Sequence, residues 1–198
     1  MTTLHEKVLA SRSYGELRKR LSGFACQRCK LHTGRTQLVV DRGSPSARIL
    51  LVGEGPGAQE DVEGAAFVGR SGKLLDMLLA EAGIDPAKEV LFANVVKCRP
   101  PGNRKPAREE ASACRPYLER QIDLIRPKVM GLLGATAAEQ FLGKSASTKL
   151  SDQVGRPISL ASRPGLRVVP LYHPAFILRN PRLRGLMVEH LRKLRAAV

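Results

Sequence analysis

Four short apolar segments, separated by stretches with helical spacing, constrain the fold of this chain more than any other feature. They cover residues 48–52, 90–94, 128–133 and 166–172. Apolar runs of this length are typical of strands that are buried on both faces of a sheet. Several of the intervening segments place leucine and alanine on one face of a helix. Strands that alternate with helices predict a parallel α/β sheet in a single domain, residues 1–198.

Local signals set the expected boundaries of the helices. A peripheral amphipathic helix is expected within residues 1–22. Ser71 is the expected N-cap of a second helix, which ends at Gly83. A third helix is expected over residues 109–125, with an interruption near Pro116 because proline lacks the amide proton that a helix interior requires.

The charge balance of the chain is strongly basic. Lys and Arg outnumber Asp and Glu by 33 to 18, which gives a net charge of +15 and a pI near 10.4. A domain with a pI above about 9 favours polyanions, and nucleic acid is the leading interpretation. An acidic membrane surface, or a compositional bias toward arginine, would produce the same balance. The chain contains no run of about 18 apolar residues, which a membrane span would require. The polar segment 1–20 does not resemble a secretory signal. A cytoplasmic protein is therefore expected.

A glycine-rich segment after the first apolar run holds an acidic cluster that is unusual in so basic a chain. It reads Gly-Glu-Gly-Pro-Gly-Ala-Gln-Glu-Asp from Gly53 to Asp61. The glycines allow a ligand to approach the backbone closely. Glu54, Glu60 and Asp61 are therefore candidates for a site at the carboxyl end of the strand, where open α/β sheets bind ligands. A surface turn with solvated acids is the competing interpretation. The segment lacks the Lys-Ser/Thr pair of a phosphate-binding loop.

Two further residues are candidates for the same site. Asn94 ends the second apolar run, and asparagine is depleted in strands, so its side-chain donor and acceptor suggest specific recognition. An ordinary strand-terminating asparagine is the alternative. Phe67 lies in a small-residue segment close to the acidic cluster, where it would line a pocket or belong to the core.

The four cysteines form two pairs, Cys26/Cys29 and Cys98/Cys114. Disulfides are rare in cytosolic proteins, which makes a metal site the better interpretation. Four thiolates suit either a tetrahedral Zn²⁺ ion or a [4Fe-4S] cluster, and their spacing leaves both open. His32 follows the first pair and is a possible ligand, although a surface histidine is the simpler interpretation.

Five motifs occur in a fixed order between Cys26 and Pro181: GEGPGAQED, FVGRSGKLL, NVVKCRPPGNRKP, a fourth cysteine, and HPAFILRNP. In this order and spacing they resemble the family-4 uracil-DNA glycosylases. The resemblance implies the three-layer fold of that family, a central four-stranded parallel sheet flanked by helices. It also implies a structural [4Fe-4S] cluster on all four cysteines. Ala66 departs from the proline that usually precedes the stacking aromatic residue. Gly55 stands where a related branch that bonds covalently to DNA has Gln, so turnover is expected.

The same resemblance assigns roles to individual residues. The implied catalytic and substrate-binding residues are Glu54, Glu60, Asp61, His173, Gly55, Phe67, Asn94 and Asn103. Phe67 would stack on a flipped uracil, Asn94 would pair with its N3–H and O4, and His173 would stabilise charge at O2. A loop from Pro174 to Arg179 would enter the DNA helix. The expected DNA contacts are Lys97, Arg99, Arg104, Lys105, Pro174, Arg179 and Arg182.

The expected function is that of a monofunctional DNA glycosylase that starts base excision repair. It would act as a monomer on uracil-containing DNA, hydrolyse the N-glycosidic bond and release uracil, without a membrane partner. One alternative is a non-catalytic nucleic-acid-binding protein with structural Zn²⁺ in the same thiolates. An iron–sulfur redox protein is the other. Neither alternative explains the acidic cluster, Asn94 and His173 together.

Overall fold

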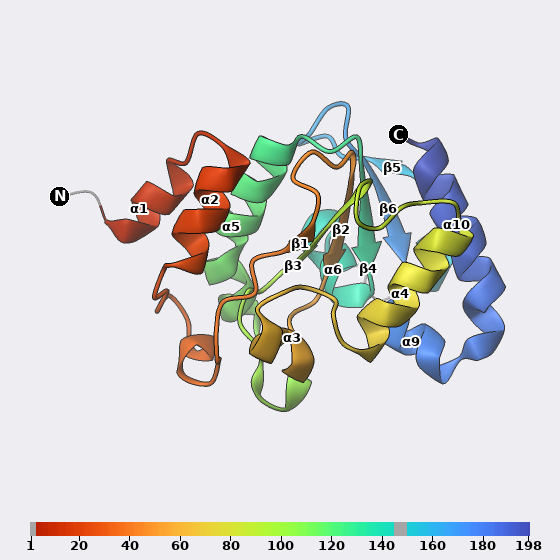
Figure 1. The fold of residues 1–198 in the computed structure, drawn as a ribbon. Coiled ribbons are helices and arrows are strands. Elements are labelled where there is room, and N and C mark those ends of the chain that lie inside the picture. The colour runs from red at the N-terminus through yellow and green to blue at the C-terminus, as the bar shows by residue number, and fades with distance from the viewer. Residues whose placement is uncertain (1–2, 145–149) are drawn as a thin grey trace.

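A mixed sheet forms the centre of the molecule, in a computed structural model that describes residues 3–144 and 150–198 (Figure 1). Its strands are β1 (Arg42–Gly43), β2 (Ile49–Gly53), β3 (Val90–Asn94), β4 (Val129–Leu133), β5 (Ile158–Ser159) and β6 (Arg167–Leu171). Their order across the sheet is β1-β3-β2-β4-β6-β5. The four inner strands are parallel, and β1 and β5 pair antiparallel at the two edges. The expected four-stranded parallel sheet is therefore confirmed, with a short antiparallel strand added at each edge.

The strand order creates a crevice between β2 and β4. The chain leaves β2 toward β3 on one side of the sheet, whereas it leaves β4 toward β6 on the other. Connections that diverge from two neighbouring parallel strands leave an opening above their carboxyl ends. The segments that follow these strands are therefore placed to line a common site.

Helices cover both faces of the sheet, because side chains alternate between the faces along each strand. The helices are α1 (Leu4–Leu9), α2 (Tyr14–Ser22), α3 (Ala58–Glu63), α4 (Arg70–Glu81), α5 (Arg108–Ile125), α6 (Ala135–Leu142), α8 (Leu150–Gln153), α9 (Pro174–Arg179) and α10 (Arg184–Ala196). Short 3-10 turns η1, η2 and η3 cover Lys30–Thr33, Pro101–Asn103 and Pro181–Leu183. Leu50 and Val52 face the core under α1, α2 and α5, while Ile49 and Leu51 face the core under α4 and α10. The resulting three layers are visible in Figure 1.

The N-terminal segment differs from the single peripheral helix that was expected. It forms two helices, because Ser13 caps a new helix by accepting the amide of Glu16 at 3.2 Å. Leu17 and Leu21 are fully buried in the core cluster that includes α5. Burying one leucine contributes about 1.5–3 kcal/mol. The segment is therefore an integral part of one helical layer.

Two further helix predictions were wrong in detail. The N-cap of α4 is Gly69 rather than Ser71, and the helix starts at Arg70, next to the Gly69 amide that donates to the Glu60 carboxylate. Helix α5 runs through Pro116 without the expected interruption. Arg28 donates to the carbonyl of Ala113 at 3.3 Å, in the turn that precedes the proline.

The described helices include none that is both long and apolar enough to cross a membrane.

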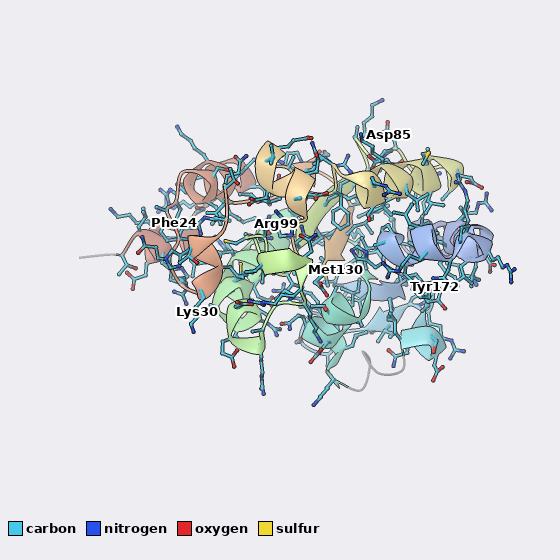
Figure 2. The ribbon with its side chains drawn as sticks, turned by 90° about the horizontal axis from the view of Figure 1, so that it is seen from below. Phe24, Lys30, Asp85, Arg99, Met130 and Tyr172 are labelled. Atoms are coloured by element: carbon cyan, nitrogen blue, oxygen red, sulfur yellow. The ribbon has the colours of Figure 1, made fainter. Side chains whose placement is uncertain are left out.

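Viewed from below, Met130 of β4 lies near the middle of the molecule, and Phe24 and Tyr172 lie toward opposite sides (Figure 2).

Candidate active site

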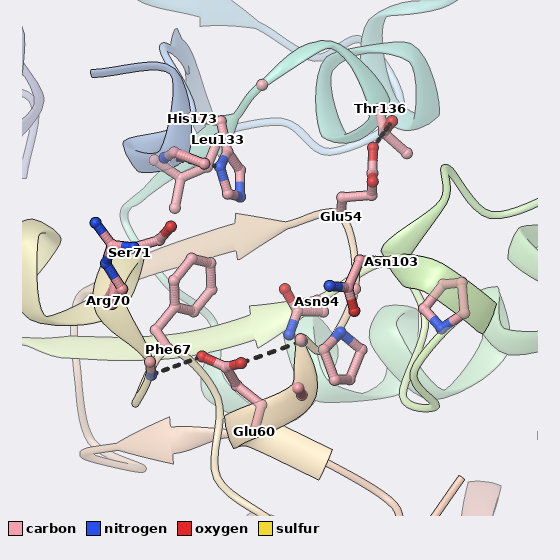
Figure 3. Close-up of a pocket in the computed structure, with 18 of the residues that line it drawn as sticks. Glu54, Glu60, Phe67, Arg70, Ser71, Asn94, Asn103, Leu133, Thr136 and His173 are labelled. Carbon is pink, nitrogen blue, oxygen red and sulfur yellow. Dashed lines mark hydrogen bonds between the residues drawn. The ribbon is translucent and has the colours of Figure 1, made fainter. Parts of the chain in front are cut away.

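A cavity of about 730 Å³ opens at the carboxyl ends of the inner strands. Its walls come from the turn after β2, the start of α3, the segment 67–71, the loop after β3, the start of α6, and α9. Figure 3 shows the side chains converging from these separate segments. The cavity thus lies at the crevice that the strand order creates.

The Phe67 ring forms one wall of this cavity. Phe67 has a left-handed backbone conformation, with φ at 57°, which is a strained conformation for a residue other than glycine. Gly72 makes the conformation possible, since a Cβ there would overlap the Phe67 carbonyl. Gly53 makes room for the ring, since a Cβ there would collide with Phe67 Cζ and lie 2.6 Å from Asn94 Oδ1. The glycines of this region therefore serve to place Phe67 and Asn94.

Asn94 is the last residue of β3, and its side chain reaches the cavity while the residue is only 2 % exposed. Its backbone carbonyl accepts a hydrogen bond from Lys97 Nζ at 2.9 Å. Among the described residues, no hydrogen-bond partner is present for its side-chain amide. Both the donor and the acceptor of this amide are therefore available to a ligand.

The three carboxylates of the acidic cluster have different surroundings. Glu54 lines the cavity and accepts a hydrogen bond from Thr136 Oγ1. Glu60 also lines it, but its two oxygens accept the amides of Gly57 at 3.1 Å and Gly69 at 2.9 Å (Figure 3). Asp61 is buried outside the cavity, where it accepts the amide of Thr36 at 3.0 Å. Neighbouring residues on a helix point in directions about 100° apart, so α3 cannot aim Glu60 and Asp61 at one ligand.

His173 is the N-cap of α9 and lies opposite Glu60 across the cavity. Its Nδ1 accepts the amide of Ala175 at 3.2 Å, so the ring proton of the neutral histidine is on Nε2. Burial lowers the pKa of His173 to about 4, helped by Arg179 and opposed by Glu60. The histidine is therefore a neutral donor at neutral pH. Gly134, whose φ is 88°, lets the ring approach, because a Cβ there would lie 3.1 Å from His173 Cβ.

The remaining substrate-binding candidates also lie at the cavity. A Cβ at Gly55 would lie 2.8 Å from Val96 Cγ2, so only glycine fits there without rearrangement. Asn103 is exposed, and its Oδ1 accepts a hydrogen bond from Arg99 Nε at 2.8 Å. Residues that were not predicted for the site also line the cavity, among them Arg70, Ser71 and Thr136. Arg70 and Ser71 belong to the motif FVGRSGKLL, but nothing in the sequence marks Thr136, which the turn before α6 brings to the cavity.

The expected DNA contacts divide into exposed and buried residues. The prediction for Lys97 was wrong, because its side chain is fully buried and donates to the Asn94 carbonyl. Arg104 is exposed and pairs with Glu110, and Lys105 is exposed and pairs with Glu139, each at 2.7 Å. Arg179 is exposed at the cavity, with Arg182 exposed beyond it. Pro174 is buried at the first position of α9, and Arg99 is half-buried.

The two cysteine pairs meet beside α5. Cys26, Cys98 and Cys114 are buried, and Cys29 is half-buried, all as free cysteines. Arg35 Nη1 donates to the Cys26 carbonyl at 2.7 Å and to Cys98 Sγ at 3.3 Å, which links the pairs. The Lys97 amide donates to Cys114 Sγ at 3.3 Å.

Burial raises the pKa of the Cys98 thiol to about 11 and that of the Cys114 thiol to about 12. A bound metal deprotonates such thiols, and the surrounding N–H donors suit the thiolates that result. The four thiols come from two loops and a helix, and such a donor set suits either a tetrahedral Zn²⁺ ion or a [4Fe-4S] cluster. His32 is tied back through Nδ1 to the Cys29 carbonyl at 2.8 Å.

The chain is similar to proteins of one superfamily. Residues 40–195 match the family model described as the uracil DNA glycosylase superfamily. A type-4 uracil-DNA glycosylase from Thermotoga maritima is 45 % identical over 87 % of this chain and 89 % of its own length. Another, from Sulfurisphaera tokodaii, is 42 % identical over 87 % of this chain and 80 % of its own. A type-5 uracil-DNA glycosylase from Thermus thermophilus is 38 % identical over half of this chain and 52 % of its own length.

Proposed function

Since this chain belongs to the type-4 uracil-DNA glycosylases, which hydrolyse N-glycosyl bonds in base excision repair, we propose that the cavity holds the flipped uracil. The substrate is uracil-containing DNA. The observation that carries the proposal is the Asn94 amide, which is buried at the cavity and lacks a protein partner among the described residues. A base inside a duplex is inaccessible, so an enzyme that acts on it must first extrude it into such a pocket.

Asn94 and Phe67 recognise the base. The Asn94 carbonyl oxygen accepts from uracil N3–H, and its NH₂ group donates to O4. Cytosine presents the opposite pattern at these two positions and leaves both groups of Asn94 unpaired, which is costly in a buried site. Phe67 supplies a stacking surface, held by its strained backbone and by Gly72. This pair supports selection of uracil over cytosine.

Glu54 and His173 act on the glycosidic bond. The bond between uracil N1 and C1′ of the sugar breaks, and its electron pair moves onto the base. The neutral His173 donates from Nε2 to O2 and stabilises the negative charge that develops there. Glu54 stabilises the positive charge on the sugar and orients the water that adds to C1′. The added water gives up one proton to solvent and the uracil anion takes up one from solvent, so the products are neutral uracil and an abasic site. Thr136 holds the Glu54 carboxylate in place.

The other two carboxylates support this arrangement. Glu60 joins the Gly57 turn to Gly69, and so holds the segment that carries Phe67 against the turn after β2. Asp61 holds the backbone at Thr36 by accepting its amide. Gly55 and Asn103 complete the cavity beside the base. The original set of three acids therefore separates into one that acts on the substrate and two that position other groups.

Exposed cations bind the DNA backbone around the cavity. Arg179 and Arg70 lie at the cavity on α9 and α4, and the described residues offer neither an ion-pair partner. The exposed Arg104, Lys105 and Arg182, together with the half-buried Arg99, extend this basic rim. Phe176 and Leu178 are 37 % and 39 % exposed on α9, which suits a wedge between DNA bases, with Pro174 fixing its start.

Cys26, Cys29, Cys98 and Cys114 would hold a [4Fe-4S] cluster, which type-4 enzymes commonly carry. Its contribution would be structural rather than chemical, because these cysteines belong to the loop after α2, the loop after β3 and helix α5. We further propose that the enzyme acts as a monomer on DNA in the cytoplasm.

The test uses a labelled oligonucleotide with one uracil, incubated with the purified protein and then treated with alkali. We expect strand breakage at uracil alone, and a loss of about 100-fold in kcat/KM for Asn94→Ala. Gln153→Ala, which removes a side chain outside the cavity, serves as the matched control and retains full activity. An intact strand that the protein still retards in a gel would instead indicate a non-catalytic binding protein.

A further inference from the structure

Lys97 is the one lysine among the described residues that is buried, and its exposed fraction is zero. Fully buried lysines are rare, because removing an ammonium group from water is unfavourable. Neither base recognition, bond cleavage nor DNA binding, as described above, uses this side chain. Its position therefore requires a separate explanation.

The contacts of Lys97 join two distant parts of the molecule. The side-chain Nζ donates to the Asn94 carbonyl at 2.9 Å, at the end of β3. The backbone amide of the same residue donates to Cys114 Sγ at 3.3 Å, on α5. Its carbonyl accepts the Val39 amide at 2.9 Å, which holds the segment from a third side. One residue thus touches both the base-reading asparagine and a cysteine of the cluster site.

Asn94 depends on this support because of where it lies. It is the final residue of β3, so the chain after it is held by contacts of the 95–98 segment rather than by a continuing strand. The following amides of Val95 and Val96 donate to the carbonyls of Gly53 and Glu54, at 2.9 and 3.2 Å. These bonds fix one side of the segment, and the Lys97 side chain fixes the Asn94 carbonyl from the other. The side-chain amide of Asn94 is then aimed into the cavity without a protein partner of its own among the described residues.

We infer that Lys97 is a positioning residue, which holds the Asn94 backbone in the orientation for reading uracil and ties it to the cysteine site through Cys114. The inference rests on the proposed function, because it takes Asn94 as the residue that reads uracil. Through Lys97, the affinity for the base then depends on an intact cysteine site. A lysine that only filled the core would be replaceable by an apolar side chain of similar length.

The test compares Lys97→Met with wild type and with Lys128→Met, an exposed lysine at the opposite end of β4. Methionine keeps most of the buried length and removes the donor. We expect free uracil to bind about tenfold more weakly to Lys97→Met. In Lys97→Met, the iron content, the visible absorbance and the affinity for uracil-free DNA stay within about twofold of wild type. In Lys128→Met, these three properties and the affinity for free uracil all stay within that range. Unchanged uracil affinity in a cluster-bearing Lys97→Met protein would overturn the inference.

A double-mutant cycle separates positioning from general destabilisation. If Lys97 acts through Asn94, then Lys97→Met lowers kcat/KM on the uracil oligonucleotide in the wild-type background but not in the Asn94→Ala background. Additive losses in the double mutant would show that Lys97 acts elsewhere.

A measurement on the unmodified holoenzyme covers the case in which Lys97→Met does not fold. Saturating uracil is expected to slow amide hydrogen exchange in the peptide that covers residues 95–99, as well as in the turn 53–57. Protection of the turn alone would contradict the inference. A wild-type protein that neither binds nor releases uracil would instead remove the proposed function, so the two failures are distinguishable.

Discussion

The cavity that we propose to hold the base and the cysteine site are joined by the segment 94–98, and they are built in opposite ways. In the cavity, side chains from several strand ends converge, and the Asn94 amide lacks a protein partner among the described residues. In the cysteine site, the sulfurs receive N–H donors from Arg35 and Lys97 and are packed into the core under α5. A site that must bind and release a ligand keeps polar groups available, whereas a site that holds a permanent group surrounds it with donors and apolar side chains.

The largest expected effect tests the chemical role of the cavity. Glu54→Gln keeps the size of the side chain and removes its charge, so kcat should fall by about 100- to 1,000-fold while KM changes little. Single-turnover assays on a uracil oligonucleotide measure this. The iron content should not change, and Glu189→Gln, an exposed glutamate on α10, is the control. Retention of full activity would move the charge-stabilising role to another group.

Cys114→Ala makes the complementary test of the cysteine site. Removing one ligand of the proposed cluster should lower the free energy of unfolding by about 3 kcal/mol and the Tm by about 10 °C. Denaturant unfolding with iron analysis measures both, and Ser112→Ala on the exposed side of α5 is the control. A variant with wild-type stability and no iron would show that the cysteine site has no structural role.

His173 provides a pH-dependent test on the cavity side. The pKa of this group is about 4 in the folded protein against 6.5 ordinarily, so between these values the unfolded chain binds more protons. The contribution of the neutral histidine to the free energy of unfolding is fully present above pH 6.5 and is lost as the pH falls toward 4. In this range the free energy of unfolding changes by at most about 1.4 kcal/mol per pH unit. Urea unfolding at several pH values should show that the free energy of unfolding falls more steeply with decreasing pH for wild type than for His173→Gln. If the two proteins gave parallel plots of unfolding free energy against pH, the histidine would not be held neutral.

The smallest effect concerns the rim of the cavity. Arg179→Ala should weaken DNA binding and reduce the slope of log K against log salt concentration by about 1, because one phosphate contact is lost. Arg163→Ala, which breaks ion pairs with Glu119 and Asp123 outside the cavity, is the control. If both variants kept the wild-type slope, Arg179 would lie outside the DNA footprint.

Local sequence patterns were sufficient for much of this protein. The apolar runs correspond to the four inner strands, and β3 has the expected bounds. This is possible because burial on both faces demands continuous apolar residues, and glycines mark the turns that follow. The order of the motifs and cysteines was enough to predict the uracil-DNA glycosylase family, which the comparisons confirm.

Other features were decided by the tertiary structure alone. Three acids within eight residues look equivalent in the sequence, but the turn after β2 and the geometry of α3 direct only Glu54 and Glu60 into the cavity. Lys97 and Arg99 lie two positions apart in one basic stretch, yet only Lys97 is fully buried. Residue type describes what a side chain can do, whereas packing between distant segments determines whether it meets water, a ligand or the core. For this protein, the sequence alone determined the fold class and the family, and the contacts between segments determined which charged residues line the cavity.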